Sequence, residues 1–141
     1  MLCLAITGFD VSPQRVTEIL GIEPTSAHSA GDALCSGRSA RTSAWHLTLS
    51  ESQSITTGDQ HHDLLQQLLA HLTDKQQNFA TLHEQAKPKE VTIDGGLHVS
   101  RDEPSGIWLE PEQMEILAAC GIGWSLDVFV AEETNAVRIA S

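Results

Sequence analysis

The stretch from Thr25 to Ser43 gathers the side chains of this sequence that are best suited to chemistry. A cysteine thiol near a histidine and an aspartate could serve nucleophilic catalysis. Two arginines could hold an anion, because each guanidinium offers a planar fork of N–H donors. The spacing fixes no geometry, so a solvated loop without a catalytic role is the competing interpretation. The candidate ligand-binding residues of this stretch are His28, Asp32, Cys35, Arg38 and Arg41.

Asp127 is the sixth candidate, because it stands within an otherwise apolar run near the end of the chain. Successive side chains of a strand point to opposite faces, so Asp127 is expected to face away from Leu126 and Val128. On a covered face its carboxylate must be paired or protonated, whereas on an open face it is an ordinary surface residue. The sharper hypothesis is that Asp127 bridges to the loop that begins at Thr25.

The seven histidines invite a metal hypothesis that their spacing does not support. His61 and His62 are adjacent, so on a helix their side chains point about 100° apart. Neither the HxxxH nor the HExxH spacing occurs, and the three cysteines form no CxxC pair. The phosphate-binding P-loop and the GxSxG nucleophile motif are also absent from the sequence. We therefore predict no metal and no cofactor, and we assign no catalytic residue.

The elements that position these candidates begin with a strand over Leu2–Phe9, whose two alternating sets are both small or apolar. A helix follows: Ser12 can cap it, Pro13 fits its first turn, and Gly21 fits the left-handed position just past its end. Beyond the loop, the run WHLTL at Trp45–Leu49 alternates apolar and polar residues and predicts a second strand.

The middle of the chain predicts two helices. Thr57 or Asp59 starts the first, whose leucines recur at helical spacing as far as Leu72. The second runs from Asp74 to about Ala86. We expect the leucine stripe to lie in the core, although it could also form an interface.

The last third of the chain predicts more strands. Glu90–Ser100 alternates like a strand, and its Gly95-Gly96 pair indicates a hairpin turn or a bulge. Gly106–Leu109 predicts a short strand, Trp124–Val130 predicts a longer one, and Asn135–Ala140 could add an edge strand. Before Trp124, a helix opened by proline is expected to turn three of its residues inward. These inward residues are Met114, Leu117 and Ala118.

One succession of elements occurs twice: a strand, a helix led by proline and closed by glycine, and a strand led by tryptophan. The copies span Leu2–Leu49 and Ile107–Val130. The order of all the elements suggests two ferredoxin-like half units around one sheet. Their residue identity is low, so the repetition concerns architecture alone. We predict an α+β fold in a single domain over residues 1–141, with helices packed on a mostly antiparallel sheet.

Composition narrows the class of partners. The 141 residues hold 8 Lys and Arg against 19 Asp and Glu, a formal net charge of -11. Such a chain repels phosphate backbones, so nucleic-acid binding is disfavoured. The charge could suit a basic protein partner, although the preferred interpretation is an acidic surface of the kind common in soluble proteins. An odd number of distant cysteines is typical of reduced thiols. Without a signal peptide or an apolar run of membrane-spanning length, we expect a cytoplasmic protein with no membrane partner.

Several motifs occur in an order that resembles a known family. The run VTEILGIEPT at Val16–Thr25 is followed by Gly31-Asp32 and by the strand that Trp45 leads. Near the end, a helix that closes in Ala-Cys-Gly precedes LDVF at Leu126–Phe129. Together these motifs resemble the bacterial domain-of-unknown-function 4279 family over nearly the whole chain. The resemblance implies a single-domain α+β protein and no established activity. This chain has Ser26–Ala30 where the family often has an aromatic residue.

We expect a non-catalytic protein-interaction module of an immunity or regulatory type, because an acidic domain without a catalytic signature fits binding. The alternative is a small-ligand-binding protein or an enzyme that uses residues 25–41. An enzyme needs a pocket where His28, Asp32 or Cys35 converges with Asp127. An interaction module instead needs an exposed apolar or acidic face. The sequence leaves the oligomeric state open.

Overall fold

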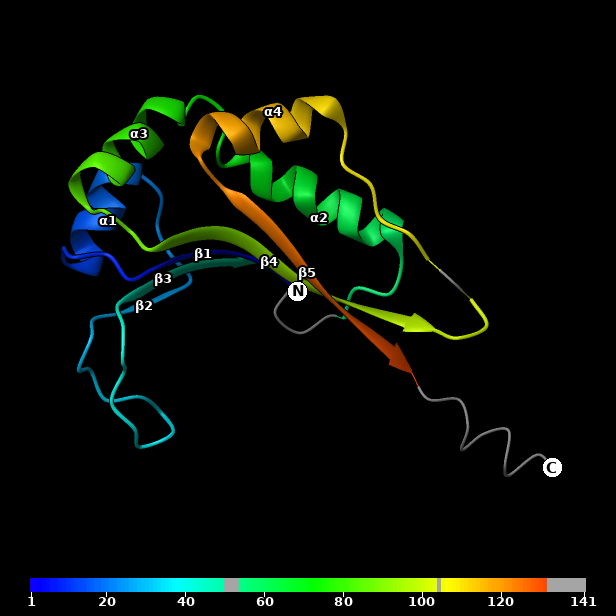
Figure 1. Cartoon of the computed structure of the whole chain (residues 1–141), viewed down its shortest axis with the longest axis horizontal. Helices are drawn as coiled ribbons and strands as arrows, with labels where there is room; N and C mark the ends of the chain where they lie inside the picture. The colour runs from blue at the N-terminus through cyan, green and yellow to red at the C-terminus, as the bar shows by residue number, and fades with distance from the viewer. Residues whose placement is uncertain (50–53, 104, 132–141) are drawn as a thin grey trace.

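The computed structural model describes residues 1–49, 54–103 and 105–131. Within these ranges the strands are β1 (Leu2–Thr7), β2 (Ser26–His28), β3 (Ala44–Leu49), β4 (Glu90–Ser100) and β5 (Gly123–Ala131). They form one sheet in the order β2-β3-β1-β4-β5 (Figure 1). Neighbouring strands are antiparallel, except for β4 and β5, which run parallel.

The helices of the described ranges are α1 (Pro13–Leu20), α2 (Gly58–Ala70), α3 (Gln76–Gln85) and α4 (Pro111–Cys120). Local sequence sets both ends of α1. The Ser12 hydroxyl accepts a hydrogen bond from the Arg15 N–H at 3.1 Å, and Gly21 follows the helix with a φ of 66°. Thr57 caps α2 through a capping box. The predicted starts of α1 and α2 are therefore confirmed, whereas α3 begins at Gln76, two residues after the expected Asp74.

All the described helices lie on one face of the sheet (Figure 1). Beneath them, the alternating side chains of β1 at Leu2, Leu4 and Ile6 are fully buried. Trp45 of β3 is also fully buried, and its indole N–H donates to the Thr17 hydroxyl of α1 at 3.0 Å. The leucine stripe of α2 packs into this core, as expected. No helix in the described ranges combines the length and the apolar character of a membrane span.

The α+β fold in one domain, with a mostly antiparallel sheet, is confirmed, whereas the two halves of the chain are built differently. The strands on either side of α1 are β1 and β3, which are antiparallel neighbours. The strands on either side of α4 are β4 and β5, which are parallel neighbours. The chain after α1 reverses through β2 before β3, while α4 alone returns the chain parallel to β4. Strand pairing therefore does not support two equivalent ferredoxin-like half units.

The glycine pair of β4 serves packing instead of a turn. β4 runs unbroken from Glu90 to Ser100, so the expected hairpin turn or bulge is wrong. A Cβ on Gly95 would stand 2.9 Å from Leu2 Cδ1 and 3.1 Å from Leu126 Cδ1. The glycine therefore leaves room for side chains from the strands on both sides.

The segment Gly106–Leu109 is irregular, so the strand expected there is wrong. The Gly106 carbonyl packs against Gly58 at the start of α2, and Trp108 stacks on His62 with ring centroids 5.0 Å apart. These contacts hold the segment against α2, so it does not pair with a described strand. The other expected strand, Asn135–Ala140, lies outside the described residues.

α4 presents a different face to the core from the one expected. Leu117 is buried as predicted, but Met114 and Ala118 are exposed, and Gln113 and Cys120 are buried in their place. The Gln113 side chain can enter because its carbonyl oxygen accepts the Glu110 backbone N–H at 2.7 Å in a capping box. A polar residue thus occupies a core position, which apolar spacing alone does not reveal.

Candidate functional site

The face of the sheet opposite the helices is covered by none of the described helices, and we call it the helix-free face (Figure 1). Successive side chains of a strand point to opposite faces of the sheet. The residues of β1 that separate its buried Leu2, Leu4 and Ile6 therefore point to the helix-free face. The register places Cys3 between Thr48 of β3 and Asp94 of β4. It likewise places Ala5 opposite His46. The polar residues that alternate with apolar ones in several strands therefore share one surface.

Four titratable side chains cross the helix-free face from one edge of the sheet to the other. They come from four different strands, and we call them the open-face row: His28, His46, Asp94 and Asp127. Burial, and then the proximity of His28, lower the pKa of His46, while Asp94 opposes this change. Partial burial raises the pKa of Asp94, and the negative charges of Glu90 and Asp127 add to it. Charges on opposite edges of the sheet are thus linked through its middle.

The open-face row is an electrostatic surface and not a hydrogen-bonded acid–base pair. No hydrogen bond or ion pair joins its four members to one another in the structure described here. General acid–base catalysis requires hydrogen-bond reach between the groups that exchange a proton. The described ranges also contain no group of three or more His, Cys, Asp or Glu side chains that could hold a metal ion. The arrangement fits recognition of opposite charge.

Residues 29–43 form a projection between β2 and β3, which we call the arm. The arm is a small hairpin: Gly31 and Ala40 are joined by a backbone hydrogen bond of 2.8 Å, and Ala33 bridges Ser39. It extends from the sheet on the side away from the helices (Figure 1). The arm thus borders the helix-free face at the β2 edge.

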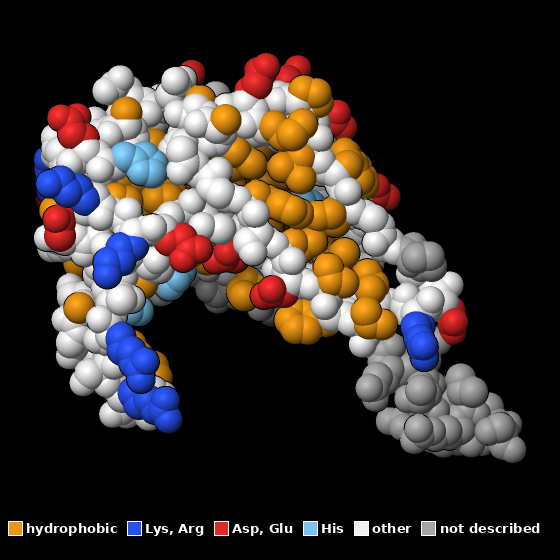
Figure 2. Space-filling model, in the orientation of Figure 1, with side chains coloured by type: hydrophobic (Ala, Val, Ile, Leu, Met, Phe, Trp, Pro, Cys, Tyr) orange, Lys and Arg blue, Asp and Glu red, His pale blue; other side chains and the backbone are white. Residues whose placement is uncertain are grey.

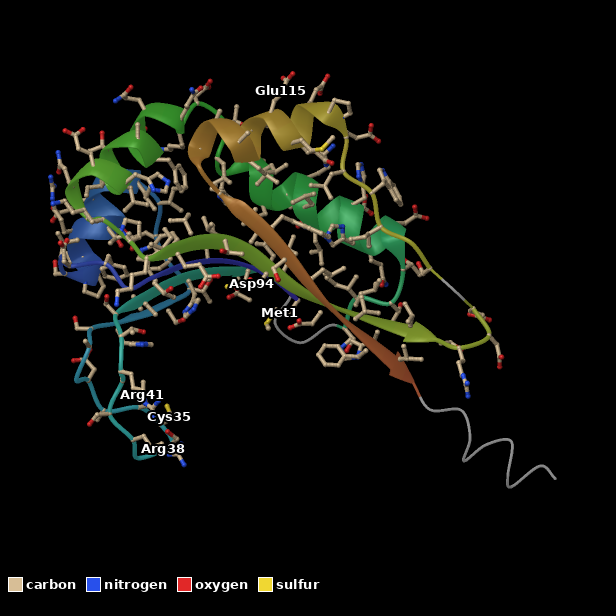
Figure 3. All side chains as sticks on the ribbon, in the orientation of Figure 1. Met1, Cys35, Arg38, Arg41, Asp94 and Glu115 are labelled. Carbon is tan, nitrogen blue, oxygen red and sulfur yellow. The ribbon has the colours of Figure 1, made fainter. Side chains whose placement is uncertain are left out.

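The arm separates the five loop candidates into different places. His28 belongs to β2, and the Asp32 carboxylate accepts the Ser29 N–H at 2.8 Å, where it stabilises a turn of the arm. The exposed side chains of Cys35, Arg38 and Arg41 lie together toward the far end of the arm (Figure 3). Figure 2 shows the basic side chains of the arm and the acidic ones under the sheet as separate groups.

Asp127 lies on β5, at the sheet edge opposite the arm, so the structure does not bring it together with Cys35 or Arg38. Of the other five candidates, only His28 lies with Asp127 on the helix-free face. The partners that link these two, His46 and Asp94, were not singled out from the sequence. The sequence does show that each of them is a polar residue between apolar ones in a strand. It does not show that their strands lie close together, because strand order depends on the tertiary fold.

A separate hollow of about 390 Å³ lies on the helix side, between α4 and the turn that joins α2 to α3. Its lining includes Leu72, Asp74, Glu115 and Cys120, none of which was a candidate. Cys120 is buried, and burial raises the pKa of its thiol. The thiol is therefore held in its protonated, unreactive form.

Comparison with known proteins identifies a family and no activity. Residues 1–131 match the family described as a domain of unknown function (DUF4279). No curated protein matches the chain. No solved structure matches it either. Because the match covers nearly the whole chain and agrees with the motifs around Val16–Thr25, this protein belongs to the DUF4279 family.

Proposed function

We propose that the protein is a non-catalytic protein-interaction module that binds its partner through the helix-free face. The observation that carries this proposal is the open-face row, which crosses a sheet face that no described helix covers and whose four members form no ion pairs with one another. Such charges are free to pair with those of another protein. A regulatory or immunity-type role fits this arrangement, because binding alone would be its activity.

The chemistry of the face favours a partner with lysine and arginine side chains. Glu90, Asp94 and Asp127 are all exposed, and each lies on the helix-free side of its strand. An apolar contact is available beside them, since Phe129 stacks on His98 with centroids 4.8 Å apart and stays 51% exposed. A partly exposed aromatic ring near complementary charges is typical of an interface anchor.

The alternative, a ligand-binding protein or an enzyme using residues 25–41, receives no support from these positions. It requires His28, Asp32 or Cys35 to converge with Asp127. The Asp32 carboxylate is engaged within the arm, Cys35 lies toward the far end of the arm, and Asp127 is on the opposite sheet edge.

The test compares two variants that each remove two negative charges. Asp94→Asn with Asp127→Asn changes the helix-free face, whereas Glu112→Gln with Glu115→Gln changes exposed carboxylates of α4 on the helix side. Affinity capture from the native cell, followed by cross-linking and mass spectrometry, measures the partner retained and the residues it touches. We expect the first variant to lose the partner at least tenfold, since close interfacial charge pairs contribute about 1.5 kcal/mol or more each.

The second variant should retain the partner as the unchanged protein does, and the cross-links should fall on the strands of the sheet or on the arm. The proposal fails if both variants retain the partner equally, or if the cross-links map to the helices. Loss of the partner with both variants would indicate that net charge alone attracts it, which also contradicts a specific face.

A further inference from the structure

The two edges of the sheet are finished in different ways. β2 forms one edge and is only three residues long, with the arm directly after it. β5 forms the other edge, runs for nine residues and pairs with β4 along its whole length. No other strand of the described ranges pairs with the outer side of β5. A short edge strand is protected from pairing with another chain, whereas a long one is a template for it.

β5 also lacks most of the features that usually protect an edge, and Asp127 is its only charged residue. It contains no lysine and no proline, and its register with β4 advances one residue at a time from Gly123 to Ala131, without a bulge. Three successive apolar side chains near its end are more than half exposed: Val128, Phe129 and Val130. Figure 2 shows hydrophobic side chains gathered over this part of the molecule. Such an edge is expected to be covered in the native protein.

We propose that a second copy of this chain covers it, with two β5 strands paired antiparallel about a two-fold axis. The apolar sequence of β5 favours this occupant, and charge permits it. With a net charge of -11, two copies repel each other unless they meet where carboxylates are scarce, and β5 carries only Asp127. A two-fold contact joins the same surface on both copies, which is the commonest arrangement of protein dimers.

The sequence of β5 is compatible with such self-pairing. When Val128 lies opposite its own copy, Leu126 lies opposite Val130, and these apolar residues all share the helix side of the sheet. On the helix-free side, Asp127 then lies opposite Phe129, so the two carboxylates do not face each other directly. The pairing extends the two sheets into one and leaves the open-face row of each copy uncovered.

The experiment measures the mass of the full-length protein by sedimentation and light scattering over a wide range of concentrations. We expect a dimer of the 15.3 kDa chain that dissociates on dilution. Val128→Lys should raise its dissociation constant at least tenfold, because it places a charge at the two-fold axis. Met114→Lys is the matched control, since Met114 is also apolar and 50% exposed but lies on α4. The dissociation constant of the Met114→Lys dimer should equal that of the unchanged protein.

Hydrogen exchange of the β5 amides distinguishes which chain segment pairs with the outer edge of β5. Protection that grows with protein concentration supports pairing between copies. A monomer at every concentration overturns the proposal, and protection of β5 in that monomer would assign the outer edge to residues 132–141 of the same chain. Equal weakening by Val128→Lys and Met114→Lys also overturns it. Circular dichroism of each variant verifies that the fold is retained.

Discussion

The two faces of the sheet are built from alternate residues of the same strands, yet they serve different ends. On the helix side, Leu4 and Ile93 are fully buried and take part in one continuous core. On the helix-free side lies the adjacent residue of β4, Asp94, whose pKa is raised first by desolvation and then by the carboxylates of Glu90 and Asp127. One face contributes stability through apolar burial, and the other accepts an electrostatic cost from neighbouring carboxylates.

Each side of the sheet also has one histidine whose pKa is lowered by burial. The two histidines have different surroundings. His61 of α2 is fully buried, edge-on to Trp124 with centroids 5.8 Å apart, and neither ring nitrogen has a hydrogen-bond partner among the described residues. The neighbouring His62 lowers its pKa further. His46 on the helix-free face has Asp94 nearby, which offsets part of the lowering. Because both pKa values are lowered, protonation of either imidazole as the pH falls should destabilise the fold.

The largest effect should come from Trp45→Ala on the helix side. We expect a loss of about 3–5 kcal/mol in the free energy of unfolding, because the change opens a cavity and removes the indole hydrogen bond to Thr17. Urea denaturation measures it. Ser125→Ala on the helix-free face is the control and should change stability by less than about 0.5 kcal/mol. Similar losses from both substitutions would remove the distinction between the faces.

An intermediate effect should come from His61→Phe, and it should depend on pH. The folded-state pKa of His61 is below 6.5, so the unfolded chain takes up the proton first as the pH falls past that value. Wild-type stability should decline there, while the phenylalanine variant should decline less. Thermal melts at neutral pH and at about pH 5 compare the two slopes. Parallel slopes would show that charging this buried imidazole does not limit stability.

The smallest effect should come from Asp94→Asn on the helix-free face. The raised pKa means that charging Asp94 costs more in the folded state, a penalty that develops as the pH rises above 3.8 and persists at neutral pH. The variant should therefore be more stable at neutral pH, by no more than about 0.5 kcal/mol because surface charges are screened. The gain should shrink in high salt. A loss of stability instead would assign Asp94 a structural role.

Much of the fold could be predicted from the sequence, because caps and apolar spacing act over a few residues. The limits of α1 follow from Ser12, Pro13 and Gly21, and each takes the predicted role. The predictions that were wrong concern residues whose environment is made by residues far away in the sequence. Gly95 accommodates Leu2 and Leu126 from adjacent strands, a reason that does not appear in its local sequence.

The candidate residues show the same division. Composition and motifs alone determined an acidic α+β domain of this family, and they marked His28 and Asp127 as unusual. Only the tertiary structure decided that these two share a face with His46 and Asp94, and that the arginines project on the arm away from them. The physical reason is strand order: residues far apart along the chain become neighbours through hydrogen-bonded register, and helical or strand periodicity has no information about which strands will pair.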